Sequence, residues 1–202
     1  MDTTTTDGTI GREPEWGSEL VEQLDWHWQA QLRPRLEGLT DDEYFWEPVP
    51  NCWSIRRRSG GTEPHLHGTG DWATEYTSHQ YEQEPFTTIA WRLGHMIVDV
   101  FATRTGRHFG GSALDDETYA YAGTAAEALR QLDGGYAAWL TGVTSLDIEG
   151  FRRPCGQREP HRPAASMAEL VLHINREAIH HGAEIALLRD LYASGKPTSI
   201  TT

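Results

Sequence analysis

The sequence predicts an all-α fold, a four-helix bundle with a long crossover connection between its first two helices. Apolar residues recur at helical spacing in four segments, capping motifs precede several of them, and no segment shows the clear alternation of a half-buried strand. A chain of 202 residues, 38% of them hydrophobic, can bury one sizeable core. We expect a disordered polar tail at residues 1–14 and a single helical-bundle domain at residues 15–202.

The first two helices are indicated by apolar spacing together with proline and glycine. Ser18 is a candidate N-cap for a helix whose apolar residues recur as far as Leu32, and Pro34 is expected to kink or end it. The second helix is expected over about residues 85–105, with Gly106 as its C-terminal stop.

The last two helices each begin with a capping box, in which two side chains satisfy each other's free backbone amides. TAAE begins at Thr124, before an apolar stripe that runs to Val143, and SMAE begins at Ser166, before a helix that ends ahead of Gly195. A third capping box, TDDE at Thr40, predicts a short helix after the first long one.

About forty residues then separate Trp46 from Pro85, far more than a usual loop. Because this connection contains Trp46, Trp53 and Trp72, we expect it to form an ordered aromatic cover. Its HxH motif, His65 and His67, has no third ligand nearby in the sequence, so we expect both side chains to be solvated.

Charge and composition exclude several classes of partner. A net charge of -13 argues against nucleic acid and anionic membranes, and the local Arg56–Arg58 run is expected to pair with acidic neighbours. Cys52 and Cys155 have no CxxC spacing, which excludes a thiolate zinc motif and favours a reducing compartment. With no signal peptide and no apolar run long enough to cross a bilayer, the protein is expected to be cytoplasmic.

The last helix carries unusual ionisable chemistry in HINREAIHHGAEIALLRDLY, residues 173–192. At about 100° per residue, Glu177 and His181 fall on the arc of the apolar core residues, whereas His173 and His180 fall on its shoulder. Side chains four apart on a helix lie close enough to hold one ion. The alternative is a hydrogen-bonded Glu–His pair inside the bundle.

The second helix supplies a matching residue. TTIAWRLGHMIVDVF is apolar nearly all round except for one stripe, which contains Arg92, His95 and Asp99 and must therefore face something inside the bundle. His95, Glu177 and His181 together form a set of two nitrogens and one carboxylate. Three protein ligands leave a coordination position open, as in catalytic metal sites.

These features resemble the DinB superfamily. The similarity rests on FWEPVPNCWSIRRR, PFTTIAWRLGHMIVDV and LVLHINREAIHHGAEIALLRDLY, and it implies a four-helix bundle with the metal ligands His95, Glu177 and His181. Many family members have histidine where this chain has Glu177, while the branch related to maleylpyruvate isomerase has glutamate there.

The resemblance further implies thiol chemistry, because characterised relatives use mycothiol or bacillithiol in S-transfer or isomerisation. We expect one divalent transition metal, zinc or nickel, with mycothiol as co-substrate and a small electrophile as the other partner. A metal-dependent hydrolase and a non-catalytic, stress-related metal-binding protein are the alternatives.

Two further residues are candidates for a catalytic role. Asp99 could orient an imidazole or accept a proton, or it could be an ordinary salt-bridge partner. Arg92 could bind a carboxylate of the thiol or substrate, or it could pair with Asp99 or Glu177. His173 and His180 are expected to be surface residues rather than ligands.

The last helix also has a second apolar stripe, nearly opposite the first. Leu172, Ile179 and Ala186 recur at seven-residue spacing, and we expect them either to form a homodimer interface or to be covered by the long connection.

Overall fold

The computed structural model of the protein describes residues 15–60, 65–77, 85–112 and 114–195, so the predicted tail at residues 1–14 lies outside the described part. The helices there are, in chain order, α1 (Trp16–His27), η1 (Trp28–Leu32), α2 (Arg33–Arg35), α3 (Asp41–Tyr44), α4 (Ile89–His95), η2 (Met96–Ala102), α5 (Thr103–Phe109), α6 (Ala125–Thr144), α7 (Ile148–Arg152), η3 (Gly156–Arg158) and α8 (Met167–Gly195). The described chain is therefore mostly helical, as predicted.

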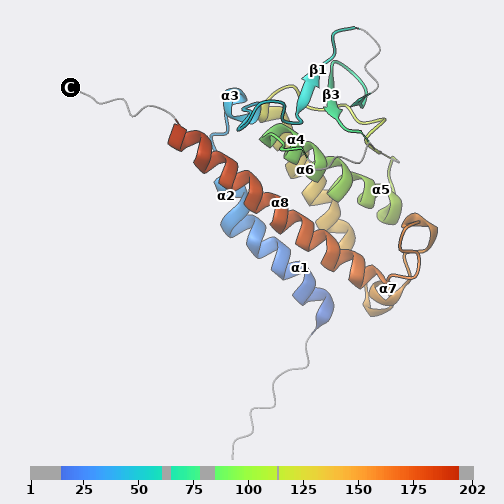
Figure 1. Cartoon of the computed structure of the whole chain (residues 1–202). Coiled ribbons are helices and arrows are strands. Elements are labelled where there is room, and N and C mark those ends of the chain that lie inside the picture. The colour runs from blue at the N-terminus through green and yellow to red at the C-terminus, as the bar shows by residue number, and fades with distance from the viewer. Residues whose placement is uncertain (1–14, 61–64, 78–84, 113, 196–202) are drawn as a thin grey trace, which may run out of the picture.

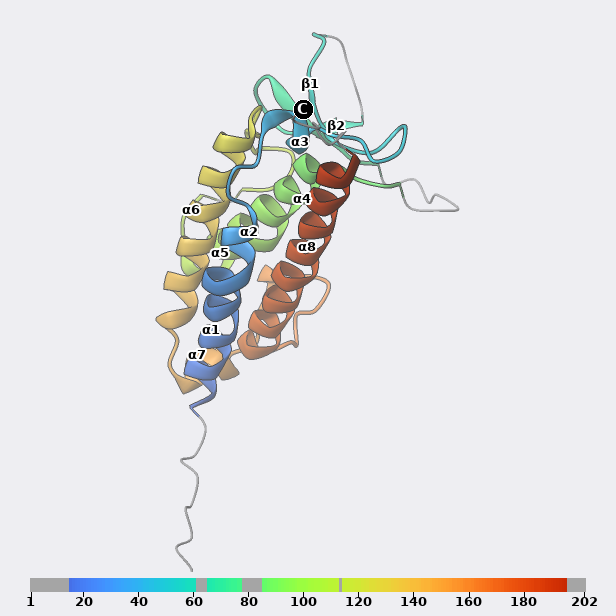
Figure 2. The same ribbon diagram turned by 90° about the vertical axis from the view of Figure 1, so that its left-hand side faces the viewer.

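The long helices lie side by side around one hydrophobic core (Figures 1 and 2). The continuous segment formed by α4, η2 and α5 contacts both α6 and α8, and α1 contacts α6 and α8 as well. At the centre the ring of Trp28 stacks on Tyr136 at a centroid distance of 3.8 Å and meets Phe101 edge-on at 6.2 Å. This packing brings α4 against α8, the two helices that carry the predicted ligands.

The first two long helices differ at their ends from the predicted boundaries. The first begins at Trp16, after Glu15, so Ser18 lies inside it and is not its N-cap. Pro34 falls in the last, short segment α2, as expected of a residue that ends a helix. The second begins at Ile89 because the Thr88 hydroxyl accepts a hydrogen bond from the Trp91 amide.

The second helix also continues past Gly106. It ends at Phe109, before Gly110, whose φ of 91° lies in the left-handed region that glycine tolerates best. Gly106 was therefore the wrong stop, because a glycine inside a helix costs only about 1 kcal/mol and packing outweighs that cost.

The capping motifs place three helix starts correctly. At Ser166 the box is complete, since its amide donates to Glu169 and its hydroxyl accepts from the Glu169 amide. At Thr40 the hydroxyl accepts from the Glu43 amide, but the Glu43 carboxylate instead accepts a 2.6 Å hydrogen bond from Arg189 of α8. The second half of this motif therefore joins α3 to α8.

The all-α prediction is wrong for the long connection, which contains a three-stranded antiparallel sheet. The strands are β1 (Ile55–Arg57), β2 (Leu66–His67) and β3 (Trp72–Glu75), in the order β1-β3-β2, with Ile55 opposite Thr74 and His67 also opposite Thr74. Strands of two to four residues are too short for an alternating pattern to be recognised in sequence. The sheet lies beside α4, which both β1 and β3 contact (Figure 1).

The described part of the connection is ordered by its own contacts. Arg56, from the basic run, pairs at 2.8 Å with both Glu47 and Glu75, in line with the expectation that acidic neighbours neutralise it. Trp53 lies against Trp91 of α4, with ring centroids 6.1 Å apart. Among the described helices, none combines the length and apolar character that a membrane crossing requires.

Candidate metal centre

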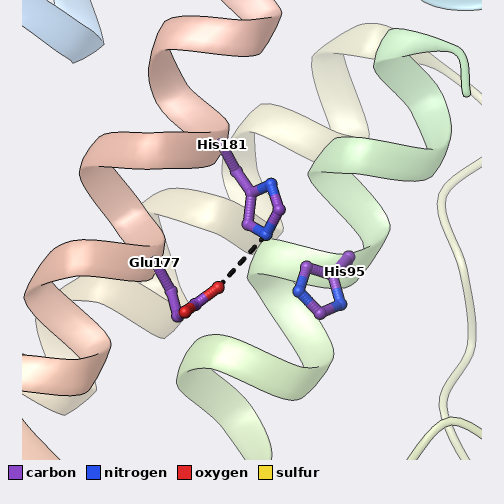
Figure 3. Close-up of side chains that lie close together, drawn as sticks. All are labelled: His95, Glu177 and His181. Atoms are coloured by element: carbon purple, nitrogen blue, oxygen red, sulfur yellow. Dashed lines mark ion pairs between the residues drawn. The ribbon is translucent and has the colours of Figure 1, made fainter.

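The structure brings His95, Glu177 and His181 together. One ligand atom from each residue lies within 4.8 Å of the other two, with His95 at the end of α4 and the other two residues one turn apart on α8. Figure 3 shows the two imidazole rings and the carboxylate turned toward one another. His181 is buried, whereas Glu177 and His95 are partly exposed, so the cluster is open on one side.

His181 presents an unprotonated nitrogen to this cluster. Its Nδ1 lies 2.6 Å from Oε2 of Glu184, and because a carboxylate only accepts hydrogen bonds, Nδ1 carries the proton. Nε2 is then left with its lone pair and lies 3.4 Å from Oε2 of Glu177. Burial lowers the pKa of His181 below its ordinary value, which favours the neutral form that a metal requires.

His95 is held in the same way. Its Nδ1 lies 2.9 Å from Oδ2 of Asp99, so its Nε2 is free, and its ring stacks on Trp91 at a centroid distance of 5.6 Å. The wide π-helical segment η2 begins directly after His95. Asp99 lies four residues after His95, inside this segment, so the two side chains share one face of the helix. Short π-helical segments often occur at functional sites.

The spacing in the cluster suits a divalent ion. Two ligand atoms that are each about 2.1 Å from a tetrahedral zinc lie about 3.4 Å apart. Nε2 of His181 and Oε2 of Glu177 have this separation. With no proton on Nε2, two lone-pair atoms face each other there, and a cation between them would remove the repulsion. The residues therefore fit a metal with a 2-His-1-carboxylate ligand set.

Glu184, which the sequence pattern did not single out, contacts two of the candidate site residues. It orients His181, and its Oε2 also accepts an ion pair from Arg92 at 3.1 Å. The 3.4 Å contact between Arg92 and Nδ1 of His181 follows from this shared oxygen. The sequence does contain a signal for Glu184. It lies three residues after His181, a spacing at which two side chains on a helix are neighbours.

The two flanking histidines lie outside the three-residue set. His173 lies 3.5 Å from the far oxygen of Glu177, and the exposed His180 lies 3.4 Å from Glu184. Their nitrogens contact carboxylates that the cluster already uses. Both positions agree with the shoulder assignment.

The glycines beside the ligands permit close approach of neighbouring segments. A Cβ on Gly94 would lie 3.2 Å from both Ile55 and Tyr121, and one on Gly182 would lie 2.8 Å from Leu32 of η1. The sheet and the first helix can therefore pack directly against the two ligand-bearing helices.

Two other groups among the described residues also have ligand atoms within 4.8 Å of one another. One is His180, His181 and Glu184, which shares His181 with the candidate metal centre, and the other is His67, Asp116 and Glu117. The expectation that His67 is solvated is wrong, because its side chain is only 19% exposed and both ring nitrogens are engaged. Nδ1 lies 2.6 Å from Glu117 and Nε2 lies 3.1 Å from the carbonyl oxygen of Tyr76. His65, its neighbour in the HxH motif, is exposed.

Comparison with known proteins gives one match. Neither the curated proteins nor the solved structures contain a significant match to the chain. A family model described as the DinB superfamily matches residues 23–185. Because this match covers most of the chain, including His95, Glu177 and His181, the protein belongs to the DinB superfamily.

Proposed function

We propose that this protein is a metal-dependent enzyme built on a four-helix bundle of the DinB kind, and that it transfers or isomerises substrates with the help of a mycothiol-type thiol. The observation that carries the proposal is the convergence of His95, Glu177 and His181, with each imidazole oriented by its own carboxylate. Such orienting carboxylates are characteristic of metal-binding histidines.

A divalent ion held by these three residues, zinc or nickel in this proposal, would favour the thiolate form of a bound thiol, whose ordinary pKa is about 8.5. The chain's own residues prepare this chemistry. Asp99 and Glu184 keep the Nδ1 protons of His95 and His181 in place, and Glu177 contributes a negative charge. The partial exposure of His95 and Glu177 leaves a side open to a thiol and an electrophile.

Asp99 and Arg92 are assigned supporting roles in this proposal. Asp99 accepts the hydrogen bond from Nδ1 of His95 and so holds this imidazole in the orientation in which its other nitrogen can bind the metal. Arg92 holds Glu184, and its partly exposed side chain is also near enough to His181 to attract an anionic group of the thiol. Both cysteines are buried and free, consistent with the reduced cytoplasm in which such thiols are used.

The test is turnover with mycothiol and a panel of electrophiles, with and without added metal. We expect activity to require both metal and thiol. Glu177→Gln should lower the rate strongly but change the free energy of unfolding little, because it removes the charge of a ligand at a partly exposed position. His173→Ala is the matched control and should keep most of the activity, because His173 contacts Arg176 and the oxygen of Glu177 that faces away from His181.

The alternatives are distinguished by the same assay. Turnover without any thiol would replace the transferase proposal with a hydrolase that uses water as its nucleophile. Absence of turnover with every electrophile, with the metal bound, would support a non-catalytic metal-binding protein.

We also propose that the protein forms a homodimer through the second apolar stripe of α8, which contains Leu172, Ile179 and Ala186. Leu172 and Ile179 are 54% and 40% exposed, so the described part of the long connection does not cover them, and Ala186 lies on the same side of the helix. Burying exposed apolar residues favours association. Ile179→Glu should convert a dimer to a monomer in solution scattering, whereas a wild-type protein that is monomeric at high concentration would refute the dimer.

A further inference from the structure

A cavity of about 300 Å³ lies on the other side of His95 from the metal cluster. Its walls come from β3 and the residue after it, α4, η2 and the segment that precedes α6. Aromatic and acidic side chains dominate the lining, which includes Tyr76, Trp91, His95, Asp99, Asp116 and Tyr121. The volume falls at the small end of the range for ligand pockets.

The negative charge in this cavity is only partly balanced, because His67, which lies within 4.8 Å of Asp116, is already hydrogen-bonded to Glu117. Within the described residues, Asp99 pairs only with His95, and no arginine forms an ion pair with Asp116. Burial raises the pKa of Asp116, and repulsion by the Asp99 carboxylate raises it further. Partly buried carboxylates are costly without a compensating cation.

Tyr121 supplies a second, independent indication of a ligand. Its side chain is buried, with 8% of the residue exposed, and it lines the cavity beside the two carboxylates. Its ring meets Tyr119 at a centroid distance of 5.4 Å, but its hydroxyl makes no hydrogen bond with any described residue. The ring is buried, but the hydroxyl oxygen is not among the fully buried polar atoms that lack a partner, so it can form a hydrogen bond with a molecule in the cavity that Tyr121 lines.

The ligand chemistry follows from what the cavity offers. A calcium-like ion needs six to eight oxygen ligands, whereas two carboxylates and one phenol in a cavity of about 300 Å³ leave most of the volume to aromatic walls. An organic ammonium group matches both parts. Its charge faces Asp99 and Asp116, one N–H can donate to Tyr121, and its carbon atoms contact aromatic surface.

We propose that this cavity is a binding site for a small organic ammonium ion. Because Asp99 contacts both the cavity and His95, the bound cation would sit one side chain away from the metal cluster. The site does not depend on the proposed thiol chemistry.

Calorimetric titration with n-butylammonium and choline tests the proposal, with 1-butanol and butyrate as neutral and anionic controls. We expect both ammonium ions to bind and both controls to fail. Asp116→Asn should weaken binding by about tenfold or more, the effect of losing one charge-assisted hydrogen bond. Glu117→Gln is the matched control, since this adjacent carboxylate faces His67 and does not line the cavity.

Tyr121→Phe provides a second variant that removes only the hydroxyl, and it should weaken butylammonium more than choline, because choline has no N–H to donate. Repeating the titration with His181→Ala separates this site from the metal cluster, and ammonium binding should persist in that variant. The proposal is overturned if no ammonium ion binds, if butanol binds equally well, or if Asp116→Asn and Glu117→Gln have equal effects. Saturation of the cavity by a divalent metal alone would also overturn it.

Discussion

Among the described residues, the cluster of His95, Glu177 and His181 and the cluster of His67, Asp116 and Glu117 both combine histidine with carboxylates, but they differ in the distance that separates nitrogen from oxygen. At His181 the nitrogen that faces Glu177 is 3.4 Å from its oxygen, whereas at His67 the nitrogen that faces Glu117 is only 2.6 Å away. The first distance fits two ligands on one tetrahedral ion, and the second fits a hydrogen bond. The same residue types can therefore form a spacing that suits a metal ion in one cluster and a hydrogen bond in the other.

The partner of the other ring nitrogen explains this difference. In His181, Nδ1 donates to Glu184, which leaves Nε2 unprotonated toward Glu177. In His67, Nε2 donates to the Tyr76 carbonyl, and a proton on Nδ1 is needed to join Glu117 at 2.6 Å. His67 thus forms an imidazolium that ties β2 to the segment containing Asp116 and Glu117.

The largest effect is expected from removing one histidine of each cluster. His181→Ala should reduce metal content from close to one ion per chain to nearly none, because only two ligands remain. His67→Ala should leave the metal content unchanged, because a hydrogen bond joins His67 directly to Glu117 and leaves no space for an ion between them. Elemental analysis of protein purified without chelator measures both.

Two neighbouring histidines control for general damage to α8. His180→Ala and His173→Ala should largely retain the metal, since His95, Glu177 and His181 all remain in both variants. Loss of the metal in His180→Ala would point instead to the neighbouring group His180, His181 and Glu184. Equal loss of metal in the His173 and His181 variants would show that the ligand face of α8 has been misassigned.

A smaller effect is expected from the carboxylates that orient the metal-binding rings. Asp99→Asn and Glu184→Gln should each weaken metal affinity by about 10-fold to 100-fold without abolishing binding, because such hydrogen bonds fix ring orientation. Competition with a chromogenic chelator measures the affinity. Glu117→Gln should leave the metal affinity unchanged. A loss of metal affinity in that variant as large as in Asp99→Asn would contradict the distinction between the two clusters.

The smallest effect is an opposite response of the two clusters to pH in metal-free protein. Burial lowers the pKa of His181 below its ordinary value of about 6.5, so its contribution to stability is present above that pH and is lost as pH falls toward the folded pKa. Burial also lowers the pKa of His67, but its hydrogen bonds to Glu117 and Tyr76 outweigh this and raise it overall. Its contribution is therefore present below about pH 6.5 and is lost as pH rises through the folded pKa.

Thermal unfolding between about pH 5 and about pH 8 can resolve the two responses. The destabilisation caused by His67→Ala should be largest at the acidic end, whereas that caused by His181→Ala should be smallest there. Two parallel pH profiles would contradict the protonation states assigned to the rings.

The sequence alone determined what depends on local spacing. The helix starts at Thr124 and Ser166 follow from side chains that cap amides three residues away, and Glu177 with His181 follows from one helical turn. His95 could be assigned because its polar stripe interrupts an otherwise apolar helix. Membership of the DinB superfamily was visible in the same segments.

Only the tertiary structure decided which residues from distant parts of the chain meet. Glu43 reaches Arg189 instead of completing its capping box, and strands of two to four residues form because β3 supplies partners for β1 and β2. The cavity depends on Asp99 and Asp116 facing each other across segments that no short-range pattern relates. Periodicity identifies the face on which a side chain lies, but packing determines what that face contacts, because contacts between elements depend on the whole core.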